Sequence, residues 1–127
     1  MAKRIIDGHF TPERRYFENT LGREFDYTAA TGPYEYLLGA LSGCFTSTIL
    51  DMFFKDEEYT ALDVHIEGEK RESVPSTLKH TLISIRAKGI KDKEKFKEAV
   101  TRAAESCSIY QTISKVSEME IRIAFED

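Results

Sequence analysis

Two cysteines, Cys44 and Cys107, are the residues of this chain whose type could support nucleophilic or redox chemistry. They are too few for the disulfide framework of a secreted domain and too far apart in the sequence for a CxxC redox pair. Each lies on the apolar stripe of an expected helix. If the two helices pack together, the sulfur atoms come within disulfide range and could form a redox pair, provided that one thiol is ionised and accessible. The alternative is two inert core cysteines, because free Cys is among the most buried residue types.

Glu35 is a third candidate, although its position favours helix capping. It falls in the first turn of an expected helix, where the helix dipole favours a carboxylate. It precedes Cys44 by nine residues, so the two side chains point to opposite sides of that helix. Tyr34 and Tyr110 either line a cleft or belong to the core.

The remaining charged and metal-binding residue types show no clustering. The N-terminal arginines are expected to be solvated surface charges; they are Arg4, Arg14, Arg15 and Arg23. The histidines His9, His65 and His80 are scattered, and no second cysteine pair completes a zinc site. We therefore expect no metal and no organic cofactor.

The strongest pattern predicts a central helix from Pro33 to about Lys55. Pro at the first helical position is favourable, and apolar residues recur at helical spacing on a wide face. Because nearly the whole segment is apolar, the helix is expected to be buried on most sides. Gly39 and Gly43 lower its intrinsic stability, which indicates close approach of a second helix or backbone along a stripe of small residues.

The other expected elements are a short strand at 25–28, strands at 62–68 and 82–87 joined across Pro75, a helix at 92–105 and a strand at 119–125. Cys107, Tyr110 and Ile113 extend the apolar face of that second helix. His65 falls on the polar side of its strand and is expected to be solvated. The order β, α, β, β, α, β predicts an α+β fold.

The composition is that of a single folded domain. The chain has 127 residues, of which 41% are hydrophobic and 31% are charged, so it can build a packed core. Its net charge of -4 argues against a nucleic-acid partner. No apolar run reaches about 18 residues, and the first residues lack the apolar core of a signal peptide. We expect one domain over residues 1–127, cytoplasmic and without a membrane partner.

The segment Gly32–Cys44, GPYEYLLGALSGC, resembles the central-helix signature of the OsmC/Ohr family, whose pattern is approximately Pro-x-Glu-Leu-Leu-x-Ala-Leu-x-Gly-Cys. The second half of the chain is similar as well, with Val74-Pro75 in the strand loop and Ala103–Tyr110 around the second cysteine. The resemblance implies an OsmC-like fold, with an antiparallel sheet packed on a long central helix. It also implies an intertwined homodimer with two sites at the interface.

In the peroxidase branches of that family, a first cysteine attacks the hydroperoxide and a second one resolves the sulfenic acid to a disulfide. By resemblance these residues are Cys44 and Cys107. An Arg and a Glu assist the chemistry in those branches, which use an external dithiol as reductant. Here Tyr34 stands where the hydroperoxide branch has its Glu, and Glu35 follows one residue later, as in the YhfA-like branch. Ser108 stands where the hydroperoxide branch has Pro. The N-terminal segment is too short for the hairpin that presents the Arg in that branch, so no arginine is assigned this role.

Two functions follow as hypotheses. The first is a thiol-dependent peroxidase with a role in oxidative or osmotic stress, which reduces organic hydroperoxides through Cys44 and Cys107. The second is a non-catalytic dimer that binds a small apolar or acyl ligand in the interface cleft, with both cysteines merely packed. Fast reaction of Cys44 below the ordinary thiol pKa of about 8.5 would favour the first.

Overall fold

The computed structural model describes residues 3–127, which form two compact units, one that ends at Leu37 and one from Leu38 to Asp127. The elements of the first unit are β1 (Ile6–Phe10), β2 (Arg15–Asn19) and β3 (Glu24–Asp26). Helix α1 (Pro33–Thr48) begins in the first unit and continues in the second. The second unit then has η1 (Ile49–Phe53), β4 (Ala61–Lys70), β5 (Leu78–Lys88), α2 (Lys93–Ser106), α3 (Ser108–Ser114) and β6 (Glu118–Glu126).

The first unit is an antiparallel meander in the order β1-β2-β3. The sequence predicted only the strand near residue 25, so the expected element order lacked β1 and β2. These strands escape pattern analysis because neither of their faces is buried within this unit, and every residue of β1 is exposed. An aromatic cluster holds the meander together, with Phe17 stacked on Phe25 at 4.9 Å between ring centroids and edge-on to Tyr36 at 5.5 Å.

One N-terminal arginine, Arg14, lies at the surface as expected and also pairs with acidic side chains. The Arg14 guanidinium donates two hydrogen bonds to the Asp26 carboxylate, at 3.1 and 2.7 Å, and one to Glu24 at 3.0 Å. It also lies 3.7 Å from the centre of the Tyr16 ring. Arg14 therefore joins β3 to the turn that precedes β2 and is committed to local structure.

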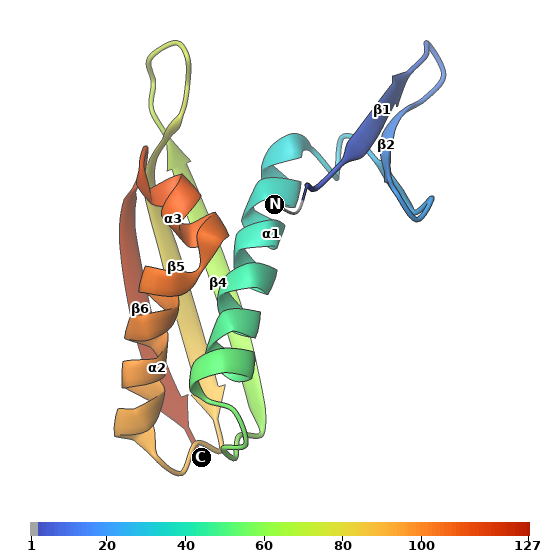
Figure 1. The fold of residues 1–127 in the computed structure, drawn as a ribbon. Helices are drawn as coiled ribbons and strands as arrows, with labels where there is room; N and C mark the ends of the chain where they lie inside the picture. The colour runs from blue at the N-terminus through green and yellow to red at the C-terminus, as the bar shows by residue number, and fades with distance from the viewer. Residues whose placement is uncertain (1–2) are drawn as a thin grey trace. The chain divides into compact units, whose positions relative to one another are not determined.

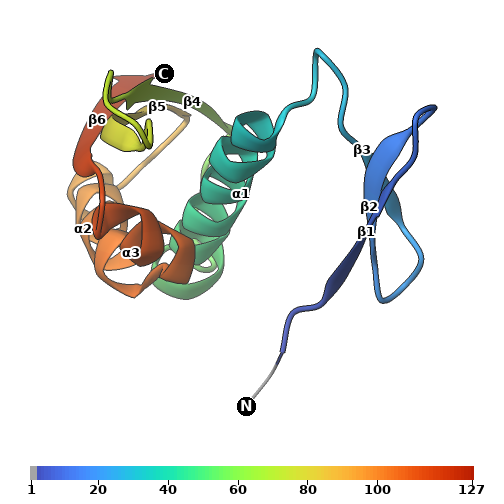
Figure 2. The same cartoon turned by 90° about the horizontal axis from the view of Figure 1, so that it is seen from above.

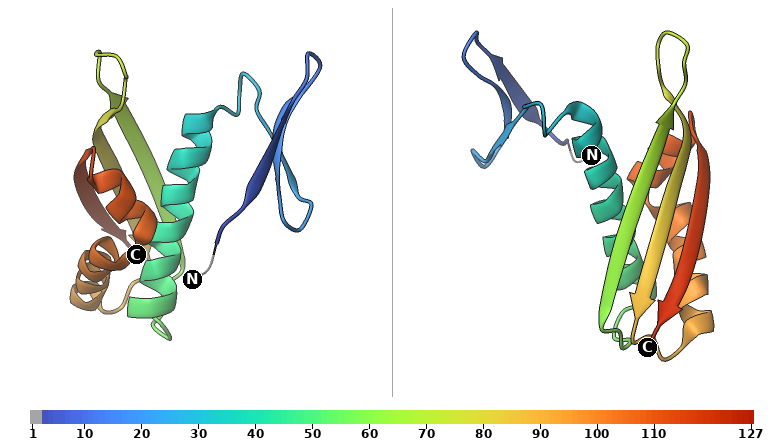
Figure 3. Two further views of the ribbon diagram at one scale, coloured as in Figure 1. Left: turned by 45° about the horizontal axis from the view of Figure 1, so that its top comes forward. Right: turned by 180° about the vertical axis from the view of Figure 1, so that it is seen from behind.

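The second unit is a three-stranded sheet, in the order β4-β5-β6, with helices on one face (Figures 1 and 2). The rear view in Figure 3 shows the sheet in front of these helices. Strands β4 and β5 form the expected wide antiparallel hairpin, and His65 is exposed as expected. Strands β5 and β6 are parallel, so the sheet is mixed rather than wholly antiparallel. The reason is the connection through α2 and α3, which returns the chain to the end of the sheet at which β5 began.

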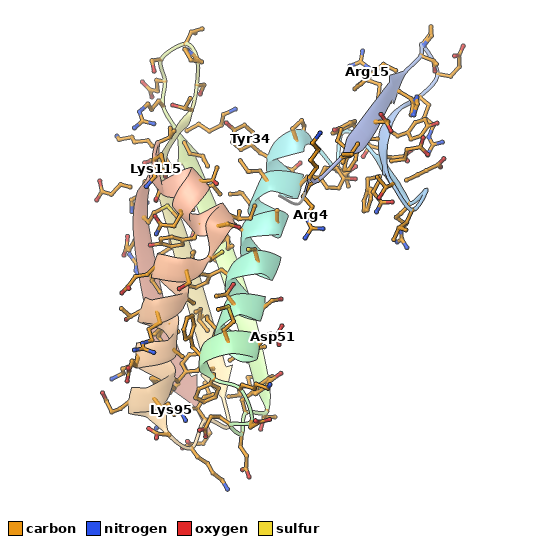
Figure 4. The ribbon with its side chains drawn as sticks, viewed as in Figure 1. Arg4, Arg15, Tyr34, Asp51, Lys95 and Lys115 are labelled. Carbon is orange, nitrogen blue, oxygen red and sulfur yellow. The ribbon has the colours of Figure 1, made fainter. Side chains whose placement is uncertain are left out.

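The core of this unit lies between the sheet and the helices. Strand β5 supplies the middle of the sheet, and its inward-facing side chains Thr81, Ile83, Ile85 and Ala87 are at most 1% exposed. The helices bury Phe45, Phe96 and Ala103 against them. The expected apolar face of the second helix is thereby confirmed. Helix α2 begins next to η1, so Lys95 near the start of α2 and Asp51 in η1 lie toward the same end of the unit (Figure 4).

Helix α1 is less covered by its own chain than the sequence predicted. Leu41 and Phe45 of α1 and Ile49 of η1 are fully buried, whereas Leu37 of α1 is 38% and Met52 of η1 is 62% exposed. A Cβ atom added at Gly39 or Gly43 would have no neighbour within 4 Å. By length and composition alone, the 21-residue segment Pro33–Phe53 could cross a membrane, contrary to the expectation above, although the core helix of a soluble protein passes the same test. An apolar face of α1 therefore remains open in the single chain.

Gly68 allows α1 to approach the sheet closely. A Cβ atom at this position of β4 would lie 2.9 Å from Leu78 Cδ2 and 3.3 Å from Leu38 Cδ1. The missing side chain thus leaves room for a leucine of α1 and a leucine of β5. The contact fixes the height of α1 on the sheet, and with it the position of Cys44.

Candidate functional site

The two cysteines come from different helices and meet in the second unit. Cys44 lies in the third turn of α1, and Cys107 lies at the junction of α2 and α3. The sequence predicted a helix over 92–105 whose apolar face Cys107 extends; Cys107 is buried, as that face requires, but it lies outside the helix. Its backbone is extended, with φ -72° and ψ 117°, so the helix stops at Ser106 and a new one begins at Ser108.

The break at Cys107 turns its side chain into a helix cap. The Tyr110 N–H donates to Cys107 Sγ at 3.4 Å, as N–H groups at the start of a helix donate to a capping side chain. The two serines that flank the cysteine, Ser106 and Ser108, are a signal that could have indicated this interruption, because serine is unfavourable inside helices and favourable at their ends.

The thiols are adjacent and unbonded. Cys107 Sγ donates to Cys44 Sγ at 3.1 Å, and both cysteines are free. A disulfide requires about 2.05 Å between sulfur atoms, so only a small movement would form the bond. Cys107 is 1% exposed, whereas Cys44 is half-buried. Of the two sulfur atoms, that of Cys44 is therefore more accessible to a reagent from solvent.

The surroundings separate the two thiols chemically. Burial raises the pKa of the Cys44 thiol, but hydrogen bonds to its thiolate outweigh this effect and leave the pKa below its ordinary value. The groups that lower the pKa are the Cys107 thiol, the Ile109 N–H and the Ser108 hydroxyl, with a smaller contribution from Thr48, whose hydroxyl donates to the Cys44 carbonyl at 2.7 Å. Burial raises the pKa of the Cys107 thiol, and the nearby Cys44 contributes in the same direction. Cys44 is therefore the thiol that ionises first, and Cys107 keeps its proton.

Nothing in the sequence indicated that Ser108 and Ile109 affect the pKa of Cys44. They lower the pKa of Cys44, and they are near it because α3 begins directly after Cys107. Tyr110, which was expected either in a cleft or in the core, stacks on Phe45 at 5.4 Å between ring centroids. Burial raises the pKa of Tyr110. This ring contact packs α3 against α1 beside the two sulfur atoms.

Glu35 has a structural contact of its own. Its Oε1 atom accepts a hydrogen bond from the Gly32 N–H at 2.8 Å, and α1 begins at the next residue, Pro33. A glutamate at the third helical position that binds the N–H of the capping residue forms half of a capping box. The groups that stabilise the Cys44 thiolate do not include it.

Metal binding finds no support over residues 3–127, where no group of three or more His, Cys, Asp and Glu side chains could hold an ion. Each histidine contacts a single carboxylate. The pairs are His9 with Glu18, His65 with Glu67, and His80 with Glu120, each at 3.0 Å.

Comparisons with known proteins concern the family and the fold of the chain. A family model described as OsmC-like protein matches residues 26–122. None of the curated proteins compared with the chain matches it.

Similar solved structures cover essentially the whole chain. A hypothetical protein from Aquifex aeolicus VF5 is 18% identical with a TM-score of 0.85, and the match covers 100% of each chain. An OsmC like protein from Mycoplasma pneumoniae is 14% identical with a TM-score of 0.82, covering 99% of each chain. An organic hydroperoxide resistance protein OsmC from Legionella pneumophila is 16% identical with a TM-score of 0.71, covering 98% of each chain. At these identities the similarity concerns the fold.

Proposed function

Because the chain belongs to the OsmC-like protein family, we propose that it is a thiol-dependent peroxidase that reduces organic hydroperoxides through Cys44 and Cys107. The observation that carries the proposal is the thiol pair at 3.1 Å, with the pKa of the accessible cysteine lowered and that of the buried one raised. The hydroperoxide resistance stated for the Legionella pneumophila relative supports a redox role in stress.

The first step uses the Cys44 thiolate as the nucleophile. It attacks the terminal oxygen of the hydroperoxide, the O–O bond breaks, and the alcohol leaves after it takes up a proton. Cys44 becomes a sulfenic acid, so the sulfur is oxidised by two electrons and the hydroperoxide is reduced by two. The donors from Ser108 and Ile109 favour this step because they raise the thiolate fraction.

The second step uses Cys107 as the resolving thiol. Its sulfur attacks Cys44, the S–O bond breaks, a disulfide forms and water leaves. An external dithiol then reduces the disulfide by exchange and restores both thiols. Each cycle therefore balances with one hydroperoxide and one dithiol consumed, without a metal or an organic cofactor. We assign this cycle to the cytoplasm, where thiols are kept reduced.

Glu35 enters the proposal as the residue that starts α1 rather than as an acid or base, because its carboxylate caps the helix at Gly32. The same residue was a catalytic candidate from the sequence, and a pair of variants described in the Discussion separates the two roles.

The homodimer expected from the family resemblance is also part of the proposal. The open face of α1 carries Gly39 and Gly43, and a Cβ atom at either would meet nothing within 4 Å. A second copy of α1 can approach closely along this face and cover it. The OsmC-like fold is a soluble fold, so we assign the apolar segment Pro33–Phe53 to the core of the dimer.

The proposal is tested with the variants Cys44→Ser and Cys107→Ser and with cumene hydroperoxide. Cys44→Ser is expected to consume no peroxide. Given one equivalent of peroxide, Cys107→Ser is expected to consume it and to hold Cys44 as the sulfenic acid, which a dimedone adduct reports. Full peroxide consumption by Cys44→Ser would rule out the mechanism.

A second candidate function is the binding of a small apolar or acyl ligand without catalysis. In the first unit, a groove of about 590 Å³ is lined by Phe10, Arg15, Tyr27, Thr28, Ala29, Gly32 and Pro33. Its aromatic walls suit an apolar group, and Arg15 suits a carboxylate at one end. If neither thiol reacts with peroxide, mass spectrometry of the native protein for a co-purified acyl compound is the experiment that remains.

A further inference from the structure

The break between α2 and α3 exposes backbone groups that a continuous helix would satisfy. The last bond of α2 is donated by the Cys107 N–H to the Ala103 carbonyl at 2.7 Å. In a continuous helix the next carbonyl, that of Ala104, would accept from the N–H of residue 108. The extended backbone of Cys107 interrupts that series, so the Ala104 carbonyl needs another donor.

Gln111 supplies this donor. Its side-chain Nε2 donates to the Ala104 carbonyl at 2.8 Å, and its own backbone N–H donates to the Cys107 carbonyl at 2.9 Å. One residue of α3 is thereby bonded to the last turn of α2 and to the cysteine between the two helices. Gln111 is half-buried, so these bonds are partly shielded from competing water.

We propose that Gln111 is a positioning residue for the resolving thiol. Its side-chain amide stabilises the junction between α2 and α3. The conformation of this junction places Cys107 Sγ 3.1 Å from Cys44 Sγ. Without that donor, the unsatisfied Ala104 carbonyl favours rearrangement of the junction and moves the sulfur of Cys107. This inference rests on the proposed function and names the residue that controls its second step.

The larger effect is expected on the second of the two chemical steps. Attack of the Cys44 thiolate on the hydroperoxide does not use the Cys107 sulfur as a nucleophile, whereas disulfide formation with loss of water does. When Cys107 is displaced, the sulfenic acid of Cys44 is not resolved to a disulfide. Further hydroperoxide then oxidises it to sulfinic acid. The signature of a lost Gln111 amide is therefore overoxidation at Cys44 in place of the disulfide.

Two variants remove the donor without changing the size of the side chain. Gln111→Met keeps the length of the chain and loses both N–H groups, and Gln111→Glu keeps the shape but accepts instead of donating when ionised. Thr112→Val is the matched control. It removes the bond from Thr112 Oγ1 to the Ser108 carbonyl, 2.8 Å long, which lies wholly within α3 and does not cross the break.

The peroxide arm of the experiment measures resolution against overoxidation. Reduced wild-type protein and each variant are mixed with increasing cumene hydroperoxide, and intact mass distinguishes the disulfide from the sulfinic acid. In Gln111→Met and Gln111→Glu, resolution is expected to fall by about ten- to a hundredfold, since misplacing a reacting group by about 1 Å can cost about a hundredfold. The rate of the first step is expected to fall much less, through the weakened hydrogen bond from Cys107 to Cys44. Thr112→Val is expected to match wild type in both steps.

The glutathione arm does not depend on peroxidase activity. Equilibration with reduced and oxidised glutathione gives the effective concentration of the Cys107 thiol toward a mixed disulfide on Cys44. A fall in this effective concentration of at least about tenfold in Gln111→Met, but not in Thr112→Val, supports the inference. This holds even if the wild-type protein does not react with peroxide; in that case only the proposed function fails. Wild-type values for both Gln111 variants in this arm would overturn the inference, whatever the peroxide arm shows.

Discussion

The Cys107 thiol donates a hydrogen bond to Cys44 Sγ at 3.1 Å, so each cysteine determines the ionisation of the other. The donor stabilises the Cys44 thiolate and lowers its pKa, while the buried Cys107 is held in its protonated form with a raised pKa. This asymmetry distinguishes a nucleophile from a resolving thiol, although the sequence presents two equivalent cysteines.

Replacing the donor is expected to raise the pKa of Cys44. In Cys107→Ala the thiolate loses a hydrogen bond, so a smaller fraction of Cys44 is ionised at neutral pH and its alkylation by iodoacetamide slows. The pH profile of the alkylation rate is expected to move to higher pH. Cys107→Ser keeps an O–H donor and is expected to shift the profile less. Identical profiles for Cys107→Ala and wild type would show that the contact does not control Cys44.

Glu35 is expected to act on stability and not on chemistry. Glu35→Ala removes the acceptor for the Gly32 N–H and is expected to lower the free energy of unfolding by about 0.3–1.5 kcal/mol, measured by urea denaturation. Glu35→Gln keeps an acceptor oxygen, so it is expected to retain both stability and peroxide consumption. Loss of peroxide consumption in a stably folded Glu35→Gln protein would instead show that Glu35 takes part in the reaction.

Gly68→Ala is expected to destabilise the protein by about 1 kcal/mol. Alanine gains about 0.5–1 kcal/mol over glycine in a strand, but its Cβ atom would press on Leu78 and Leu38, and overpacking costs about 1–3 kcal/mol. Chemical denaturation measures the balance. Adding Leu38→Val to Gly68→Ala should recover part of the loss, because it shortens the side chain whose Cδ1 and Cδ2 atoms crowd the new Cβ atom. A net gain in stability for Gly68→Ala would contradict the close approach of α1 at this point.

The open face of α1 predicts which substitutions break the proposed homodimer. Gly43→Leu places a large side chain where nothing lies within 4 Å in the single chain, so the monomer can accommodate it, and leucine favours the helix by up to about 1 kcal/mol. Two copies of α1 in close contact cannot accommodate this side chain, so sedimentation velocity is expected to show a monomer. Thr101→Leu on the exposed side of α2 is the control and is expected to stay dimeric. An unchanged dimer in Gly43→Leu would place the interface elsewhere.

Elements with one buried face were predictable from the sequence. The buried side chains of β5 and α2 alternate or recur with the period of their element, and both appear where the pattern places them. Strands β1 and β2 have no such pattern, because their side chains are not buried within the first unit. The parallel pairing of β6 was also hidden, since inward and outward alternation is the same for parallel and antiparallel neighbours.

The candidate site was predictable in its residues but not in its geometry. Cys44 and Cys107 were identified from residue type and helical position, whereas the break at Cys107 was not. The apolar spacing of Ala103, Cys107, Tyr110 and Ile113 fits one continuous helix, so the pattern conceals the change of direction. The donors from Ser108 and Ile109, and the amide of Gln111, depend on that break and could be found only in three dimensions.

The central claim is tested most directly by stoichiometric titration of the reduced protein with cumene hydroperoxide, with free thiols and intact mass as the readouts. The account predicts loss of both thiols per chain with a mass lower by two hydrogen atoms, and peptide mapping that joins Cys44 to Cys107. Survival of both thiols in a modest excess of peroxide would contradict it, and would leave the OsmC-like fold without the reaction proposed for it.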